Sequence, residues 1–166
     1  QIEFRLLVQA GDNLNFGNVN IGDPSGTPTS TNYFSMTGGK FIGHGANDSV
    51  VGNTNSTVVM NLSGNAQFKH LGNDEESSEL KLARSGSTVT INMSGTSQLA
   101  SGEYVATAQT ATGTTREGSS RLGDDLSFGG GGNLTLTMND DSQIYVNDVL
   151  YPNDDHSQGR ILRLEQ

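Results

Sequence analysis

The chain of 166 residues contains no cysteine, no tryptophan and only three prolines. The absence of cysteine excludes disulfide cross-links, thiol chemistry and cysteine-ligated zinc. No apolar run approaches the roughly 20 residues that a membrane-spanning helix requires. We therefore expect neither insertion into a membrane nor a site built on thiolates.

Basic residues are scarce as well, because nine lysines and arginines stand against eighteen acidic residues and the formal net charge is −9. An acidic surface repels the phosphates of nucleic acids, which argues against a nucleic-acid partner. Apolar residues make up only 32% of the chain, whereas glycine occurs 22 times. This composition would be typical of loops if the apolar residues were irregularly spaced.

The apolar residues are instead spaced regularly within a strand-turn unit that recurs along the chain. Residues 88–99 read TVTINMSGTSQL, in which Val89, Ile91 and Met93 alternate with polar residues. This period of two predicts a strand with one buried face. Residues 57–68 (TVVMNLSGNAQF) and 133–144 (NLTLTMNDDSQI) repeat the pattern. Their separation falls within the roughly 20 to 45 residues that are typical of stacked structural repeats.

These repeats predict an all-β fold in a single domain over residues 1–166, a right-handed parallel β-solenoid of about five coils with three sides each. Helix should be nearly absent, since no stretch shows a convincing 3.6-residue period. Residues 160–164 are expected to form the third side of the last coil. Stacking in register predicts an inward column and an outward row: Met36, Leu62, Met93 and Met138 inward, and Ser35, Asn61, Asn92 and Thr137 outward.

A polar, unpatterned stretch interrupts the repeats at about residues 103–121. We interpret it as a loop inserted in one coil, after which residues 126–128 restore the third side. Inserted loops project from a solenoid and are favoured places for function. The charged residues of this loop are the candidate contacts for a partner: Arg116, Glu117 and Arg121.

The units MNLSGNAQF and INMSGTSQL resemble the repeats of parallel β-solenoid passenger domains in bacterial autotransporters and related secreted adhesins. The resemblance covers about residues 31–146 and lies in the pattern of the repeats. It implies a secreted or surface-exposed bacterial protein that serves in adhesion or as an extracellular scaffold. Surface glycans are one class of partner for such a protein.

The two ends of the chain suggest a second class of partner. Residues 2–9 read IEFRLLVQ and residues 160–166 read RILRLEQ, and neither segment has the pattern of a capping helix. Open strand edges pair with another chain unless something covers them. We therefore expect self-association along the axis into a filament, or contact with the adjacent coils of a longer stalk.

Calcium is the one cofactor for which the sequence offers candidate ligands. Residues 43–50 (GHGANDSV) look like half of a calcium-binding nonapeptide repeat, with Asp48 as the carboxylate ligand. The adjacent pair Asp140 and Asp141 is a second candidate for holding Ca²⁺. One repeat copy does not complete a site, and adjacent strand residues point to opposite faces, so plain solvated turns remain the alternative.

No catalytic residues are predicted, because no phosphate loop, nucleophile elbow or dinucleotide fingerprint occurs. The main alternative function is a polysaccharide lyase or hydrolase, or a glycan-binding module, with the densest mixed charges at residues 69–84. A further alternative is ice binding by a threonine-rich face that includes Thr90 and Thr135. The three histidines match no metal-ligand spacing and are predicted to be exposed turn residues: His44, His70 and His156.

Overall fold

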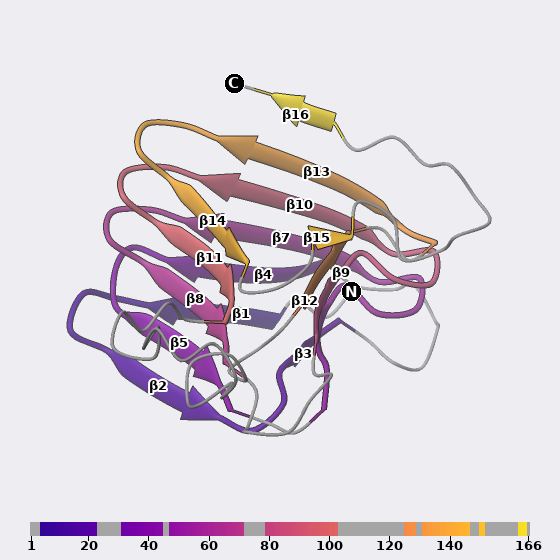
Figure 1. The fold of residues 1–166 in the computed structure, drawn as a ribbon, viewed down its shortest axis with the longest axis horizontal. Helices are drawn as coiled ribbons and strands as arrows, with labels where there is room; N and C mark the ends of the chain where they lie inside the picture. The colour runs from indigo at the N-terminus through magenta and orange to yellow at the C-terminus, as the bar shows by residue number, and fades with distance from the viewer. Residues whose placement is uncertain are drawn as a thin grey trace, which may run out of the picture.

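The computed structural model describes residues 4–22, 31–44, 47–71, 79–102, 125–128, 131–146, 150–151 and 163–165, which form strands and turns without a helix (Figure 1). None of these residues belongs to a helix of the length and hydropathy that a membrane span requires. The all-β prediction is therefore confirmed over the described part of the chain.

The strands form three sheets, and every pair of neighbouring strands is parallel. The first sheet has the order β1 (Phe4–Val8), β4 (Thr31–Met36), β7 (Thr57–Leu62), β10 (Thr88–Met93), β13 (Asn133–Met138) and β16 (Arg163–Glu165). The second sheet has the order β2 (Asn13–Phe16), β5 (Lys40–Gly43), β8 (Gln67–His70), β11 (Gln98–Ser101) and β14 (Gln143–Val146). The third sheet has the order β3 (Asn20–Ile21), β6 (Ser49–Val51), β9 (Glu79–Leu82), β12 (Asp125–Phe128) and β15 (Leu150–Tyr151).

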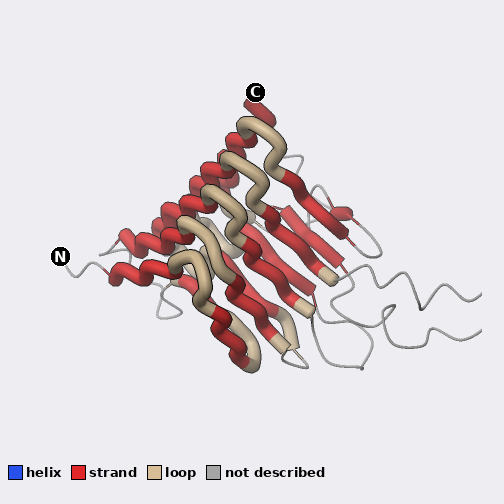
Figure 2. The backbone as a smooth tube through the Cα atoms, turned by 90° about the vertical axis from the view of Figure 1, so that its left-hand side faces the viewer, coloured by secondary structure: helices blue, strands red, loops and turns tan. Residues whose placement is uncertain are grey.

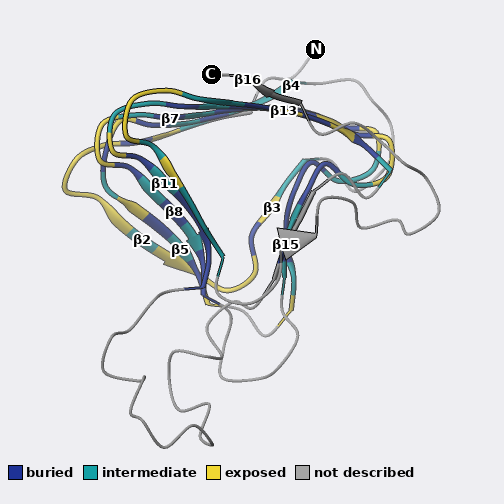
Figure 3. Cartoon of the chain, turned by 45° about the horizontal axis from the view of Figure 1, so that its top comes forward, coloured by how far each residue is buried: buried dark blue, intermediate teal, exposed yellow. Residues whose placement is uncertain are grey.

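Successive strands along the chain belong to successive sheets, so three strands complete one coil and the next strand returns to the first sheet (Figure 2). This arrangement is the predicted parallel β-solenoid of five three-sided coils. Figure 3 views the stack with its β16 end forward, and the strands follow one another counter-clockwise as the chain advances toward the viewer. The winding is therefore right-handed, as parallel crossovers almost always are.

The core is a set of columns that run through the stack. The predicted inward column is confirmed, since neighbouring strands place its four residues in register: Met36, Leu62, Met93 and Met138. Val8 of β1 extends this column by one residue. The strand β10 shows why, because its apolar residues are buried and alternate with polar residues that are wholly or partly exposed. The predicted outward row is also in register, and the Asn92 side-chain amide donates a hydrogen bond of 2.9 Å to Oδ1 of Asn61.

The turn that joins the first sheet to the second explains the Ser-Gly pairs of the repeats. Gly64 and Gly95 adopt positive φ angles of 61° and 67°. A Cβ atom on Gly95 would lie 2.7 Å from the carbonyl oxygen of Gly64, so the close approach of these two turns leaves no room for a side chain on Gly95. Asp140 takes the same place in the next coil with a φ of 56°.

The prediction for the end of the chain was wrong. Residues 160–164 were expected to form the third side of the last coil, but β15 at Leu150–Tyr151 pairs with β12 in the third sheet. The strand β16 pairs with β13, so it lies in the first sheet and starts a sixth level of the stack. A strand of two residues is too short to show an alternating pattern, which is why β15 escaped notice.

Candidate functional site

At one end of the stack, β1, β2 and β3 are each the edge strand of their sheet, and no other described strand covers them. The two large apolar side chains that are exposed in the described part of the chain both lie here, Leu7 at 57% and Phe16 at 44%. We call this end the N-terminal end face and define it by the three edge strands with Leu6, Phe16, Val19 and Ile21. Most large apolar side chains of the deeper coils are buried, so this end differs from the body of the stack.

An apolar hollow of about 240 Å³ opens at the N-terminal end face. Its lining is mainly apolar, and it consists of Leu6, Phe16, Asn18, Val19, Asn20, Ile21, Phe34 and Phe41. Three packed aromatic rings form part of its wall, since the ring centroid of Phe41 lies 4.7 Å from that of Phe16 and 4.9 Å from that of Phe34. The hollow is therefore the open end of the core column itself.

The backbone of β1 also faces outward at this end. The carbonyl oxygen of Val8 accepts a hydrogen bond of 2.9 Å from the amide of Thr37, so Val8 is directed toward β4. Alternate residues of a parallel strand bond to opposite neighbours, which directs the amide and carbonyl of Leu7 toward the free edge. Over the residues that the structure describes, the N-terminal end face thus combines strand edges that pair with no further strand and exposed apolar side chains, the combination that favours pairing with another strand.

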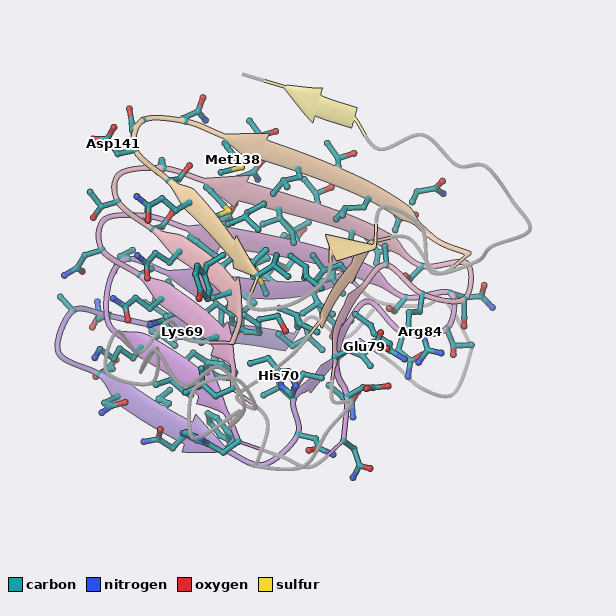
Figure 4. The ribbon with its side chains drawn as sticks, in the orientation of Figure 1. Lys69, His70, Glu79, Arg84, Met138 and Asp141 are labelled. Atoms are coloured by element: carbon teal, nitrogen blue, oxygen red, sulfur yellow. The ribbon has the colours of Figure 1, made fainter. Side chains whose placement is uncertain are left out.

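The two candidates for calcium binding, Asp48 and the pair Asp140 and Asp141, lie on different coils of the stack. Asp48 lies just before β6 and is already engaged, because its Oδ2 is 2.7 Å from Lys81 Nζ and its Oδ1 accepts a hydrogen bond of 3.0 Å from the amide of Glu79. Asp140 and Asp141 lie in the turn between β13 and β14, where Oδ2 of Asp140 accepts the amide of Gly95 at 2.9 Å. Figure 4 shows Asp141 far from Glu79.

Among the described residues, no group of three or more histidine, cysteine, aspartate or glutamate side chains is placed to hold a metal ion. The functional groups of Asp48 and Asp140 instead tie neighbouring coils together. The candidate partner-contact residues and the inserted loop at 103–121 lie outside the described residues: Arg116, Glu117 and Arg121.

His70 was predicted to be an exposed turn residue, and this prediction was wrong. It lies at the end of β8 with its side chain wholly buried, while His44 is exposed as expected and His156 lies outside the described residues. The alternation of Phe68 and His70 with Gln67 and Lys69 could have indicated an inward histidine. In Figure 4, His70 is drawn inside the stack, away from the outer surface.

The partner of His70 is a serine from the preceding coil. Ser49 Oγ lies 2.9 Å from His70 Nδ1 and accepts a hydrogen bond of 3.1 Å from the amide of Val19. A serine hydrogen-bonded to a histidine can act as a nucleophile with the histidine as its base. Here both side chains are 0% exposed, so a substrate has no access to them. The three residues come from the first, second and third coils, so this link acts as a structural tie between coils.

The outer face of the first sheet is free of charge over its four central strands. Its outward residues form three rows along the stack: Thr31, Thr57, Thr88 and Asn133; Tyr33, Val59, Thr90 and Thr135; Ser35, Asn61, Asn92 and Thr137. These include the threonines considered for ice binding. Asparagine amides and the aliphatic Val59 interrupt the rows of hydroxyl groups, and Tyr33 replaces a threonine, so the face is not a uniform threonine array.

No protein-family model, no curated protein and no solved structure matches the chain.

Proposed function

We propose that the chain is a non-catalytic, extracellular structural or adhesion scaffold whose solenoid stacks end to end. The stacking partner is a further copy of the chain or the adjacent coils of a longer stalk. The observation that supports this proposal is the N-terminal end face, where three parallel edge strands and an apolar hollow lie together. The extracellular location and the adhesive role rest on the resemblance of residues 31–146 to secreted β-solenoid repeats.

End-to-end contact would satisfy both features of this surface at once. A parallel strand placed against β1 would bond to the outward amide and carbonyl of Leu7, and apolar side chains from the same neighbour would enter the hollow beside Phe16. Burial of apolar surface contributes roughly 25 cal/mol per Å². At the other end, β16 extends the first sheet one strand beyond β14 and β15, so the first sheet of a stacked copy would make contact first.

Charge opposes this contact between copies. Each chain carries a formal net charge of −9, and stacked copies bring these charges close together. The Debye length falls from about 10 Å at 0.1 M salt to about 3 Å at 1 M salt, so salt screens the repulsion. Stacking that depends on strand edges and apolar contacts should therefore strengthen as salt is added.

Sedimentation velocity of the isolated chain over a range of salt concentrations tests the proposal. We expect species larger than the monomer whose fraction grows with protein concentration and with salt. A chain that stays monomeric under all of these conditions would exclude self-stacking. A monomer that degrades a polysaccharide in a glycan-degradation screen would replace the scaffold with an enzyme.

Two variants at one position separate the backbone contribution from the apolar one. Leu7→Pro removes an outward amide donor and leaves the Val8 bond to β4 in place, and proline is tolerated on edge strands for this reason. Leu7→Ser removes the exposed apolar side chain but keeps the amide. We expect Leu7→Pro to abolish stacking and Leu7→Ser to weaken it, with thermal melts that show both variants folded. Val59→Ser, on the outer face far from either end, is the control and should stack normally.

A further inference from the structure

A second hollow, of about 240 Å³, lies on the flank of the stack at the turn between the first and second sheets. It spans the first three coils, and its polar lining includes Asp12, Asn13, Gly39, Lys40, Asn65 and Gln67. We call it the short-turn hollow. It is separate from the apolar hollow at the N-terminal end face, with which it shares no lining residue.

The short-turn hollow comes from a turn that is one residue short. In the second coil, residues 37–40 join Met36 to Phe41, whereas residues 63–67 join Leu62 to Phe68 in the third coil. Both pairs are in register, so the second coil spans the same corner with one residue fewer. The hollow lies where this shorter turn is stacked between the longer turns of the first and third coils.

The glycines of this short turn are required by the tight packing. Gly39 has a φ of 75°, and a Cβ atom on it would lie 2.4 Å from the carbonyl oxygen of Gln9. A Cβ atom on Gly38 would lie 2.8 Å from Oδ1 of Asn65. Both positions therefore require glycine because neighbouring turns pack closely on them, and Gly39 itself lines the hollow.

The lining decides which class of ligand fits. One carboxylate and one ammonium group oppose each other in charge, since Asp12 and Lys40 both line the hollow, so neither a strong anion nor a strong cation is favoured. The side-chain amides of Asn13, Asn65 and Gln67 supply both donors and acceptors. Aromatic and aliphatic side chains are absent from this described lining, which disfavours an apolar ligand.

We propose that the short-turn hollow binds one sugar residue of a neutral carbohydrate. A neutral sugar carries hydroxyl groups that both donate and accept hydrogen bonds, and the mixed lining of carboxylate, ammonium and amide groups complements them. The volume far exceeds the roughly 10–15 Å³ that a single ordered water needs. The inference extends the proposed adhesive role by naming a ligand class and a site for it, and it does not depend on end-to-end stacking.

Amide NMR spectra of the isotope-labelled full chain test the site, with glucose, galactose, mannose and N-acetylglucosamine each added at millimolar concentration. We expect at least one of these sugars to shift the resonances of residues 12, 40, 65 and 67 in a saturable manner. The measurement is repeated in the Leu7→Pro background, so that a failure of stacking leaves the binding test intact. If none of the four sugars shifts these resonances, the proposal is wrong.

Three variants and one matched control show whether the hollow itself is responsible. Asp12→Asn and Asn65→Ala should each weaken binding by about two- to tenfold, the usual effect of one lost hydrogen bond. Thr96→Ala, at the turn position equivalent to Asn65 one coil further on, is the matched control and should bind normally. Lengthening the second-coil turn by one residue, on the pattern of residues 63–67, should fill the hollow and abolish binding while the thermal melt is kept. Equal binding by wild type and by the lengthened variant would overturn the proposal, as would saturable binding of phosphate or calcium at these residues instead of sugar.

Discussion

The division into inward and outward faces is tested most sharply by two adjacent residues of β10. Ile91 is 0% exposed and lies in register between Met60 and Leu136, which are also 0% exposed. Asn92 is partly exposed on the outer face and makes a side-chain hydrogen bond of 2.9 Å to Asn61. The substitutions Ile91→Ala and Asn92→Ala therefore remove different interactions from the same strand.

The magnitudes follow from what each side chain loses. Ile91→Ala leaves a cavity in the middle of a fully buried column, which costs about 2–5 kcal/mol of unfolding free energy. Asn92→Ala removes one hydrogen bond at a partly exposed site, which costs about 0.5–1.5 kcal/mol. At about 2–4 °C per kcal/mol for a chain of this size, Ile91→Ala should lower the Tm by about 4–20 °C and Asn92→Ala by about 1–6 °C.

Thermal melts followed by circular dichroism measure both changes, and urea unfolding gives the free energies independently. The aspartate variants extend the comparison, because Ile91→Asp places an unpaired charge in the core, whereas Asn92→Asp leaves its charge at the surface. Equal Tm values for the two alanine variants, or a larger loss for Asn92→Ala, would mean that the assigned faces are reversed.

Three further outcomes are expected, and each has its own measurement. Gly39→Ala should lower the Tm more than Gly11→Ala, because both have positive φ but only the first also meets backbone atoms within 3 Å of the new Cβ. The pKa of Lys81 is raised, since burial would lower it but the hydrogen bond and charge of Asp48 outweigh that effect. Asp48→Asn should therefore cost up to about 1 kcal/mol at neutral pH, and the difference from wild type, measured by urea unfolding, should vanish as the pH rises above the Lys81 pKa. Deletion of residues 103–121 should leave the Tm nearly unchanged, because loop closure depends weakly on length; a collapse of the melt would show that they are packed structure.

The fold was predictable where long strands repeat. The six-residue strands β7, β10 and β13 each show the alternation clearly, and their shared spacing was enough to place Leu62, Met93 and Met138 in one column. Parallel stacking followed, because each strand must return by a coil to lie beside its repeat. Short elements were not predictable in this way, as the two residues of β15 show.

The surface features depend on small differences between coils, which a pattern of apolar residues does not report. The short-turn hollow results from one residue missing in the second-coil turn, and its depth is visible only once the neighbouring turns are stacked. The burial of His70 could have been predicted, because it lies two residues after Phe68 and so faces the same side of β8. It was missed because histidine is a polar residue. The ion pair between Asp48 and Lys81 could not be predicted, because it depends on how β6 and β9 align, and these two strands belong to different coils.

Electron microscopy of the isolated chain at high salt tests the central claim most directly. Five coils at about 4.8 Å each, with one additional level from β16, predict a filament with an axial repeat of about 24–29 Å per copy. The filaments should be absent from the Leu7→Pro variant under the same conditions. Single compact particles without axial extension, at every concentration and salt tested, would contradict the account of an end-to-end solenoid scaffold.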